Sequence, residues 1–182
     1  MTARAVLVAH HDRMVAEGIA SALGCYTSLV SSAATTIGEV QAQAERLHAV
    51  ALDPDLAGSE RGATHLRRRG VRVVFLGDHG DEEESVRVPM SAPVAELASA
   101  LVPGVSLQQP GRGKLTERER DVLSLVARGF AGKEVARHLG ISAKTVERHK
   151  TKIFAKLGVP NQAAAVGIAL MNRDIARTSP WT

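Results

Sequence analysis

Short apolar runs alternate with helical patterns along the first hundred residues, and this alternation constrains the fold more than any other feature of the sequence. The apolar runs are "AVLVA" (residues 5–9), "SLVSS" (28–32), "AVALD" (49–53) and "VRVVFLG" (71–77). The segments between them have helical patterns and cover residues 13–23, 36–47 and 62–70. Strands that alternate with helices favour a parallel sheet with crossover helices, so an α/β fold is predicted for this part of the chain.

The alternation becomes weaker after Gly77. "DHGDEEES" (78–85) is an acidic loop, "VRVP" (86–89) is predicted to be a short edge strand, and residues 93–101 to be a last helix with Pro93 in its first turn. The distance from Gly77 to Met90 is too short for a full loop, helix and strand. We therefore expect the fourth helix of this domain to be absent or reduced to one turn.

The net charge differs between the two parts of the chain. Residues 1–111 carry 9 Lys/Arg and 13 Asp/Glu, a net charge of −4, whereas residues 112–182 carry 14 and 6, a net charge of +8. A basic segment beside an acidic one suggests a nucleic-acid-binding module joined to a domain with another task, although basic surface is often only solvated surface. Between them, "VPGVSLQQPGRGK" (102–114) has no periodicity and is predicted to be a linker.

The composition argues against several classes of protein. Aromatic residues make up 3% of the chain, too few for the stacking platforms that bind single-stranded nucleic acid. The single Cys25 excludes an internal disulfide and a cysteine-cluster zinc site. The sequence has neither an apolar stretch of about 18 residues nor a signal-peptide pattern, so we expect a cytoplasmic location. It has no nucleotide-binding loop, catalytic triad or metal-helix motif, so we predict neither enzymatic activity nor a cofactor.

Four short helices are predicted after the linker. Thr116 and Glu119 have the spacing of a capping box at the start of the first, and Gly140 ends the second, "GKEVARHL" (132–139). Ser142 caps a third helix that runs to about residue 157. Pro160 and Asn161 lead into a fourth helix of small and apolar residues. Two helices joined by a tight glycine turn are typical of a helix-turn-helix module.

The third of these helices combines a buried stripe with a basic surface. Val146, Ile153 and Leu157 form the stripe, which leaves a polar set on the exposed faces: Lys144, Glu147, Arg148, Thr151 and Lys152. Such a helix can lie in the major groove, where Lys and Arg neutralise phosphates and a few side chains read base edges. From the residues alone, a solvated charged helix remains the alternative.

The segment from Leu115 to Val159 resembles the DNA-binding domain of LuxR/NarL-type transcription regulators over essentially its whole length. The features that match are "LTERE", "GFAGKEVA", "LGISAKTVERH" and "IFAKLGV". The resemblance implies that Glu147 accepts a hydrogen bond from a cytosine amino group and that DNA is also contacted by Lys144, Thr145, Arg148, Thr151 and Lys152. It further implies a dimer contact on DNA through the fourth helix, from Ala163 to Met171. The alternative is that this helix is only part of the core of its own module.

With such a C-terminal domain, the first part of the chain resembles the receiver domain of response regulators, which has a flavodoxin-like fold. The resemblance rests on "VLVAHHDRMVAEGIASAL" (6–23) and on "AVALDPDLAG" (49–58), in which Asp53 stands where the phospho-acceptor aspartate should lie. A receiver holds Mg²⁺ with an acidic pair at the end of its first strand. The matching residues here are His10 and His11, whose imidazoles suit softer metals.

Two further residues of the receiver switch are missing from the sequence. The hydroxyl residue expected after the fourth strand is replaced by Gly77, or by Asp78 if the register shifts by one, and the expected lysine matches Met90 or Pro89. Phosphoryl transfer to aspartate needs the metal, and the switch needs the lysine and the hydroxyl. We therefore predict an atypical receiver that works without aspartyl phosphorylation; the alternative is a conventional regulator phosphorylated on Asp53.

His10, His11 and Asp53 are predicted to lie at the carboxyl edge of the sheet, where such folds bind ligands. One interpretation is that this candidate pocket binds a small-molecule ligand, and another is that it responds to pH through its histidines. A third is that it is the remnant of a metal site whose acidic residues were lost by drift. We predict no metal there, because neighbouring residues of a strand point to opposite faces.

The sequence thus predicts an atypical receiver-like domain (1–101), a linker (102–114) and a LuxR-type helix-turn-helix domain (115–182). We expect an orphan response regulator of the two-component type that binds duplex DNA as a homodimer, through the receiver domain and the last helix. One alternative is a signalling adaptor that acts through protein contacts. Another is region 4 of a sigma factor, but the first part of the chain lacks the aromatic-rich helix that melts promoter DNA.

Overall fold

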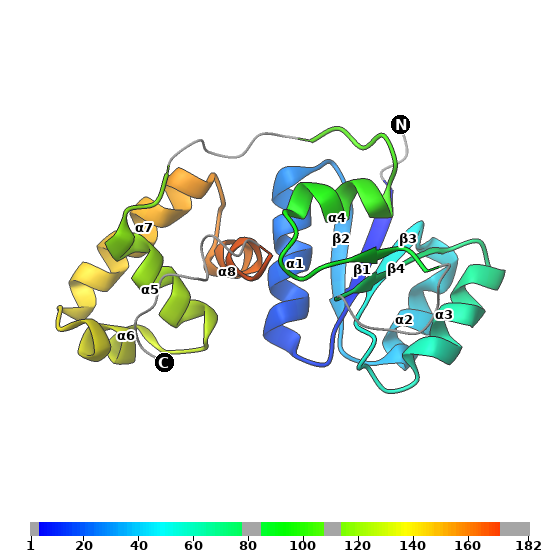
Figure 1. Cartoon of the computed structure of the whole chain (residues 1–182), viewed down its shortest axis with the longest axis horizontal. Coiled ribbons are helices and arrows are strands. Elements are labelled where there is room, and N and C mark those ends of the chain that lie inside the picture. The colour runs from blue at the N-terminus through cyan, green and yellow to red at the C-terminus, as the bar shows by residue number, and fades with distance from the viewer. Residues whose placement is uncertain (1–3, 78–84, 108–113, 172–182) are drawn as a thin grey trace.

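A sheet with helices on both faces is followed by four further helices (Figure 1). This computed structural model describes residues 4–77, 85–107 and 114–171. The sheet and its helices occupy the part of the chain up to Leu101, and the four further helices begin at Glu117. The two parts therefore follow one another along the chain, as the change in charge and pattern predicts.

Five parallel strands form the sheet, in the order β2-β1-β3-β4-β5. This is the strand order of flavodoxin-like doubly wound sheets, so the predicted fold class is confirmed. The strands are β1 (Ala5–Ala9), β2 (Val30–Ala34), β3 (Ala49–Leu52), β4 (Arg72–Leu76) and β5 (Arg87–Val88).

Helices cover both faces of the sheet because its central strands are apolar on both sides. Val6 and Val8 of β1 pack on one side, in the same cluster as residues of α1 (Arg13–Tyr26) and α4 (Val94–Leu101). Leu7 and Ala9 pack on the other side, with α2 (Ile37–Gln43) and α3 (Ser59–Arg68). The alternating side chains of β1 thus contribute to two cores.

Several element boundaries differ from the sequence prediction. α1 ends three residues later than expected, at Tyr26, and α3 spans Ser59–Arg68 in place of residues 62–70. β2 runs two residues later than expected, because its pairing with β1 starts at Ala5 beside Val30. The helix expected over residues 36–47 ends at Gln43 and continues as one 3-10 turn, Ala44–Arg46, before the chain enters β3. Pro93 is the N-cap of α4 and not part of its first turn.

The connection between β4 and β5 is short, as the sequence predicts. Ten residues, 77–86, separate the two strands, and of these 78–84 lie outside the described residues. The described residues of the connection, Gly77, Ser85 and Val86, are not helical. The connection is shorter than the crossover of a dozen or more residues typical of parallel strands, and the predicted loss of the fourth helix concerns residues outside the described ones.

The C-terminal helices are α5 (Glu117–Ala127), α6 (Gly132–Leu139), α7 (Ala143–Leu157) and α8 (Gln162–Leu170). Thr116 and Glu119 form the predicted capping box at the start of α5: the hydroxyl accepts from the Glu119 amide at 3.3 Å and the carboxylate from the Thr116 amide at 2.8 Å. Gly140 ends α6 with φ of +65°, a conformation that strongly favours glycine. The tight turn between α6 and α7 therefore has the chemistry that the sequence predicts.

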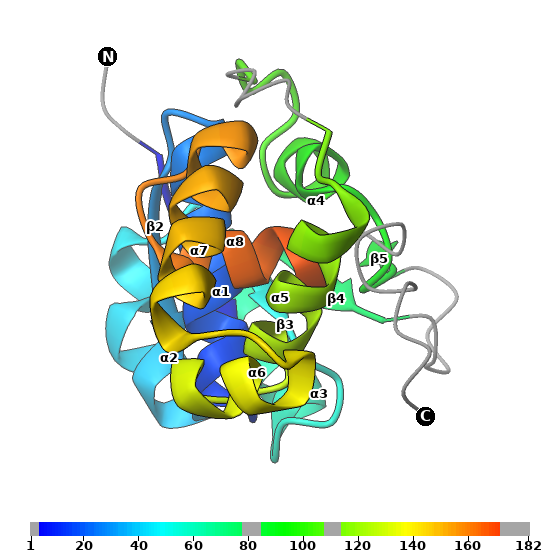
Figure 2. The same ribbon diagram turned by 90° about the vertical axis from the view of Figure 1, so that its left-hand side faces the viewer.

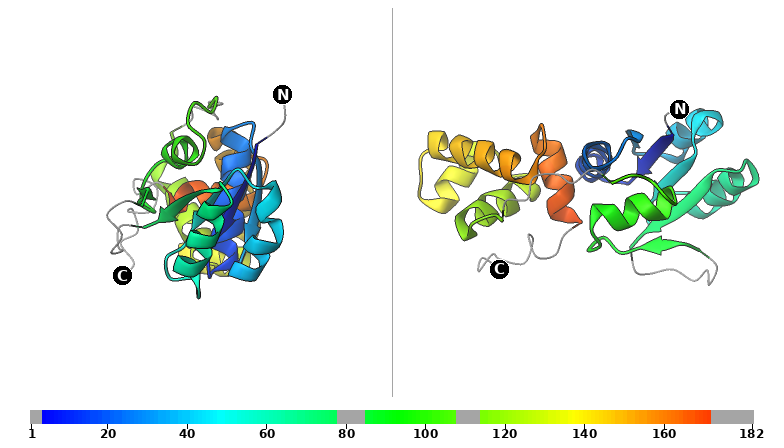
Figure 3. Two further views of the ribbon diagram at one scale, coloured as in Figure 1. Left: turned by 90° about the vertical axis from the view of Figure 1, so that its right-hand side faces the viewer. Right: turned by 90° about the horizontal axis from the view of Figure 1, so that it is seen from above.

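α8 lies beside α1 and connects the helical unit to the sheet unit (Figures 1 and 3). Buried residues of both units, among them Ile19 of α1, Val122 of α5 and Ala164 of α8, belong to one continuous apolar cluster. Among the described residues, no single helix is long and apolar enough to cross a membrane. The bent pair of α7 and α8 reaches that length and composition only when the two helices are counted together.

The capping box predicts a measurable contribution to stability. Thr116→Ala removes the acceptor for the Glu119 amide and should lower the free energy of unfolding by about 1 kcal/mol, whereas Thr116→Ser keeps the hydroxyl and most of that stability. Denaturant titration followed by circular dichroism measures both changes. Equal unfolding midpoints for the Ala and Ser variants would contradict the role of this cap.

Candidate functional site

The position of α7 is fixed at both of its ends. Ser142 caps its start, where the hydroxyl accepts from the Thr145 amide at 3.1 Å, and Gly158 ends it with φ of +66°. Near its end, Lys156 donates to the buried carboxylate of Glu119 in α5 at 2.6 Å. Burial raises the pKa of Glu119, but hydrogen bonds from Lys156 and Thr116 outweigh this and lower it, so the pair stays charged. α7 is therefore held rigidly against α5.

The outer face of α7 carries the polar residues that the sequence singled out. Val146 and Ile153 are buried on its inner face. Thr145 is half-buried, and its hydroxyl lies 2.8 Å from that of Ser142. The remaining five side chains are exposed: Lys144, Glu147, Arg148, Thr151 and Lys152. α7 lies at the front in Figure 2, on the side of the helical unit that faces away from the sheet. The sheet unit leaves this face uncovered.

Glu147 has a protein partner that sequence reasoning missed. Lys150, one helical turn further on, donates to its Oε1 at 3.1 Å. The same oxygen lies close to Gly132 at the start of α6, since a Cβ added to that glycine would be 3.3 Å from it. The i,i+3 spacing of opposite charges was the available signal in the sequence. Glu147 thus has an ion-pair partner within its own helix before any ligand arrives.

A second polar cluster lies at the carboxyl edge of the sheet. β1 and β3 are paired neighbours, with Ala9 beside Leu52, so the residues that follow them meet at one edge. The Asp53 amide donates to the Ala9 carbonyl at 2.9 Å, and the His10 amide donates to the Ala34 carbonyl at 3.1 Å. These backbone bonds bring Asp53, His10 and His11 together.

The oxygens of Asp53 are taken by protein hydrogen bonds. Oδ2 lies 2.5 Å from His11 Nδ1 and also accepts from the His11 amide at 3.2 Å. Oδ1 accepts from the Asp55 amide at 2.9 Å. His10 Nε2 stands 3.8 Å from Oδ2. The Asp53 side chain is only 6% exposed whereas that of His11 is 59% exposed, so His11 lies between Asp53 and solvent.

The two histidines face the same way, which corrects a sequence expectation. The rings of His10 and His11 are stacked, with centroids 4.3 Å apart, and both approach Asp53. Strand alternation does not apply to them because β1 ends at Ala9 and both residues belong to the following loop. Asp12, the other acid nearby, is the N-cap of α1 and accepts from the Met14 amide at 2.8 Å.

The cluster does not fit Mg²⁺, which requires oxygen ligands, because Asp53 is its only carboxylate. Its three candidate ligand atoms do lie within 4.8 Å of one another, a spacing compatible with a softer ion. However, Nδ1 of His10 accepts from the Asp12 amide at 2.9 Å, which places the proton of the neutral ring on Nε2. This nitrogen therefore presents a donor to Asp53 and no lone pair to a metal.

Burial and hydrogen bonding act against each other on Asp53. Burial raises the pKa of this carboxyl group, but the amide of Asp55 and the side chain and amide of His11 hold it below its usual range. The pKa of His10 is also lowered, chiefly by burial, although the charge of Asp53 opposes this shift. At neutral pH the cluster thus contains an aspartate anion beside a neutral His10.

The two other switch positions carry side chains that cannot bind a phosphoryl group. Gly77 directly follows β4, and its amide donates to the Val88 carbonyl at 2.9 Å. Met90 stands two residues after β5 and is half-buried against the core. Neither Gly77 nor Met90 supplies the hydroxyl or the amine of the switch, and Asp78, the alternative to Gly77, lies outside the described residues.

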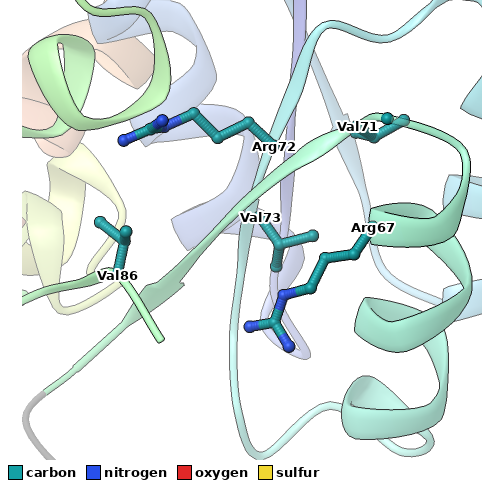
Figure 4. Close-up of a pocket in the computed structure, with 6 residues that line it drawn as sticks. Arg67, Val71, Arg72, Val73 and Val86 are labelled. Carbon is teal, nitrogen blue, oxygen red and sulfur yellow. The ribbon is translucent and has the colours of Figure 1, made fainter. Parts of the chain in front are cut away.

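A shallow hollow of roughly 350 Å³ lies beside β4, away from both clusters (Figure 4). Its basic side chains have partners within the protein: Arg67 donates to Ser85 Oγ at 2.8 Å, and Arg72 donates to the Ala100 carbonyl at 2.6 Å. The guanidinium of Arg67 also lies 5.8 Å from the centre of the Phe75 ring. These contacts within the protein account for the positions of both arginines without a bound ligand.

Comparison with known proteins adds an independent finding for the C-terminal unit. Residues 113–169 match the family model of bacterial regulatory proteins of the luxR family. The HTH-type transcriptional regulator Rv0890c of Mycobacterium tuberculosis is 45% identical over 70 residues, which are 38% of this chain and 7% of that protein. The oxygen regulatory protein NreC of Staphylococcus aureus is 44% identical over 59 residues, 32% of this chain and 27% of that protein. The chain thus spans only a small part of these curated relatives.

Solved structures of two response regulators resemble the chain over most of its length. ChrA, from a heme-sensing two-component system, shares 20% sequence identity over 93% of this chain and 97% of its own, with a TM-score of 0.44. StyR shares 23% over 92% of this chain and 98% of its own, with a TM-score of 0.47.

The lowered pKa of His10 predicts a pH-dependent stability. Below about pH 6.5 the unfolded chain binds a proton at this residue more readily than the folded chain. The stability that neutral His10 contributes is therefore present above about pH 6.5 and is lost as the pH falls through the pKa of His10 in the folded chain. We expect the free energy of unfolding to decrease from about pH 7 to about pH 5, and to decrease less in His10→Asn. Denaturant titrations across this range measure both slopes; a steeper slope in the variant would contradict the assignment.

Proposed function

We propose that the chain is a transcription regulator that binds duplex DNA, since residues 113–169 match the family model of bacterial regulatory proteins of the luxR family. In this proposal, residues 1–101 are an atypical receiver-like domain, 102–114 a linker and 115–182 the DNA-binding domain. The protein works as a homodimer in the cytoplasm, where its DNA target lies. The observation that carries the proposal is the set of exposed cations on the outer face of α7, Lys144, Arg148 and Lys152. Figure 2 shows the place of this helix.

The proposed contact places α7 in the major groove. A helix with buried apolar residues on one side and cations on the other fits the groove, where the cations release counterions from phosphates. The proposed DNA-contacting residues are Lys144, Thr145, Arg148, Thr151 and Lys152. Glu147 keeps its proposed role toward a cytosine amino group through Oε2, since Oε1 already accepts from Lys150.

Control of this regulator is proposed to be independent of aspartyl phosphate. Asp53 is shielded by His11, its oxygens accept protein hydrogen bonds, and the cluster offers Mg²⁺ too few oxygen ligands. Gly77 and Met90 could not bind the phosphoryl product. The signal would instead be a small molecule that acts at the candidate pocket of His10, His11 and Asp53.

The proposed DNA contact predicts a specific change in salt dependence. Using operator DNA selected from a random pool by the wild-type protein, Arg148→Ala or Lys152→Ala should weaken binding. Each should also reduce the slope of log affinity against log salt by about 1, because one phosphate is no longer neutralised. Arg61→Ala, at an exposed position of α3, is the charge-matched control and should bind like the wild type.

Two results would count against this assignment. If the α7 variants bind DNA with the wild-type affinity and slope, another surface makes the contact. If the wild-type protein selects no DNA sequence at all, the adaptor hypothesis gains support over the DNA-binding one.

The proposed independence from aspartyl phosphorylation predicts that the protein does not react with a small phosphoryl donor. After incubation with acetyl phosphate and Mg²⁺, intact-protein mass spectrometry should detect no phosphoryl adduct, and DNA affinity should be unchanged. A conventional receiver domain, treated in parallel, controls for the reagent. An adduct that disappears in Asp53→Asn and that alters DNA affinity would refute phosphate-independent control.

A further inference from the structure

The two edges of the sheet differ in how they are protected from pairing with another chain. β5, at one edge, has two residues, one of which is Arg87, whereas β2, at the other edge, has five residues and no charge or proline. Figure 2 shows these two strands at opposite sides of the sheet. Short length, charged side chains and proline are the usual means by which an edge strand avoids a second chain. β2 has none of them.

β2 also lies within a long uncharged segment. Residues 18–38 contain no Asp, Glu, Lys or Arg, although these residues make up 23% of the chain. Part of the segment is on the surface beside the edge: Gly24 and Ser28 are exposed before the strand, and Val30 at its start is 59% exposed. Charged residues are depleted at the core of protein interfaces. The surface around β2 thus has the composition of an interface.

The hydrogen bonds of β2 show which of its backbone groups are free to pair. The Val30 amide and the Ala34 carbonyl bond to backbone groups next to the two ends of β1, each at 3.1 Å. Because alternate residues of a parallel strand bond to the same neighbour, Ser32 also faces β1. The amides and carbonyls of Ser31 and Ala33 therefore point away from the sheet.

Two side chains close the edge on either side of β2. The Thr27 hydroxyl accepts from the Leu29 amide at 3.1 Å, and the Glu39 carboxylate accepts from the Thr35 amide at 2.8 Å. By the same alternation, these are the next outward amides before and after the strand. The open part of the edge therefore lies within β2 and is centred on Ser32.

We propose that β2 pairs with the β2 of a second copy of the chain, antiparallel and across a two-fold axis at Ser32, so that the two sheets join. In this register Ser31 lies opposite Ala33 of the other copy, and each such pair exchanges both backbone hydrogen bonds. The inference rests on the proposed function for its homodimer, and it gives the sheet unit the surface through which the two copies meet.

A second copy fits this edge better than an unrelated chain. In a two-fold contact each surface meets itself, so a charge close to the axis would face a like charge. The lack of charge over residues 18–38 removes this repulsion, and it also removes the charge pairs that would select a different partner. The side chains that would meet, those of residues 30–34, are small on both strands, so the strands can approach without a clash.

The first test places a charge on the proposed axis. In Ser32→Lys, and likewise in Ser32→Glu, two like charges would face each other across the dimer. Each variant alone should have a dimer dissociation constant at least about tenfold higher than wild type in analytical ultracentrifugation with a thiol reductant. An equal mixture of the two variants should recover the dimer, because Lys then faces Glu. Misfolding of either variant could not be corrected by mixing.

Thr64→Lys and Thr64→Glu are the matched controls for these charges. Thr64 is an exposed hydroxyl residue of α3, a helix that packs against β4 and not at the β2 edge. Both control variants, alone and mixed, should dimerise like the wild type.

The second test observes the outward backbone groups directly. Hydrogen exchange of the wild-type protein, measured by NMR at low and high protein concentration, should slow at the amides of Ser31 and Ala33 as the dimer forms. The amide of Ser32 bonds to β1 and should be protected at both concentrations. A dimer that used another surface would leave the two outward amides in fast exchange.

The outcomes separate this proposal from the proposed function. If the wild type is monomeric at every concentration, or if the Ser32 variants dimerise like the Thr64 variants, pairing through β2 is refuted, and DNA binding through α7 still stands. If the mixture of Ser32 variants recovers the dimer but the wild type selects no DNA sequence, the proposed function fails and the pairing through β2 stands.

Discussion

The relation between the two units of this protein depends on the backbone contact between Gly18 and Gly167. Because neither residue has a side chain, α1 and α8 approach closely enough for their buried residues to form one apolar cluster across the chain. Without this contact, α8 would expose one whole apolar side to water, since its opposite side faces α5 and α7. A solvent-exposed α8 of this kind needs a partner, which gives the contact a role beyond packing.

The same helix, α1, begins at the histidine cluster. Asp12 caps α1 and follows His10 and His11 directly, so the loop that shields Asp53 is continuous with the helix that covers α8. In this cluster, imidazole and backbone donors satisfy the aspartate in place of a metal ion. A ligand that disturbs the bond between His11 and Asp53 would therefore act at the N-terminus of α1.

The sequence predicted the local features well and the long-range contacts poorly. The alternation of strands and helices along the chain, the caps of α5 and α7 and the exposed face of α7 follow from periodicity and capping chemistry, which act over a few residues. The order of the strands in the sheet came from the resemblance to receiver domains. The common direction of His10 and His11 depends on where pairing with neighbouring strands ends β1, which their own sequence does not specify. Gly18 and Gly167 lie far apart in the chain, and neither has a local pattern that marks it as a contact.

The distance between the two units tests most directly whether the contact between Gly18 and Gly167 sets their relation. Pulsed electron paramagnetic resonance on the full chain, with spin labels at the exposed positions Glu60 of α3 and Glu117 of α5 in a Cys25→Ser background, reports their distance. We predict a single short distance in the wild-type protein and a longer, broader distribution in Gly18→Leu, whose side chain would enter the crossing of α1 and α8. An unchanged distance distribution in Gly18→Leu would show that α1 keeps its place on α8 without the glycine contact, and would contradict this account.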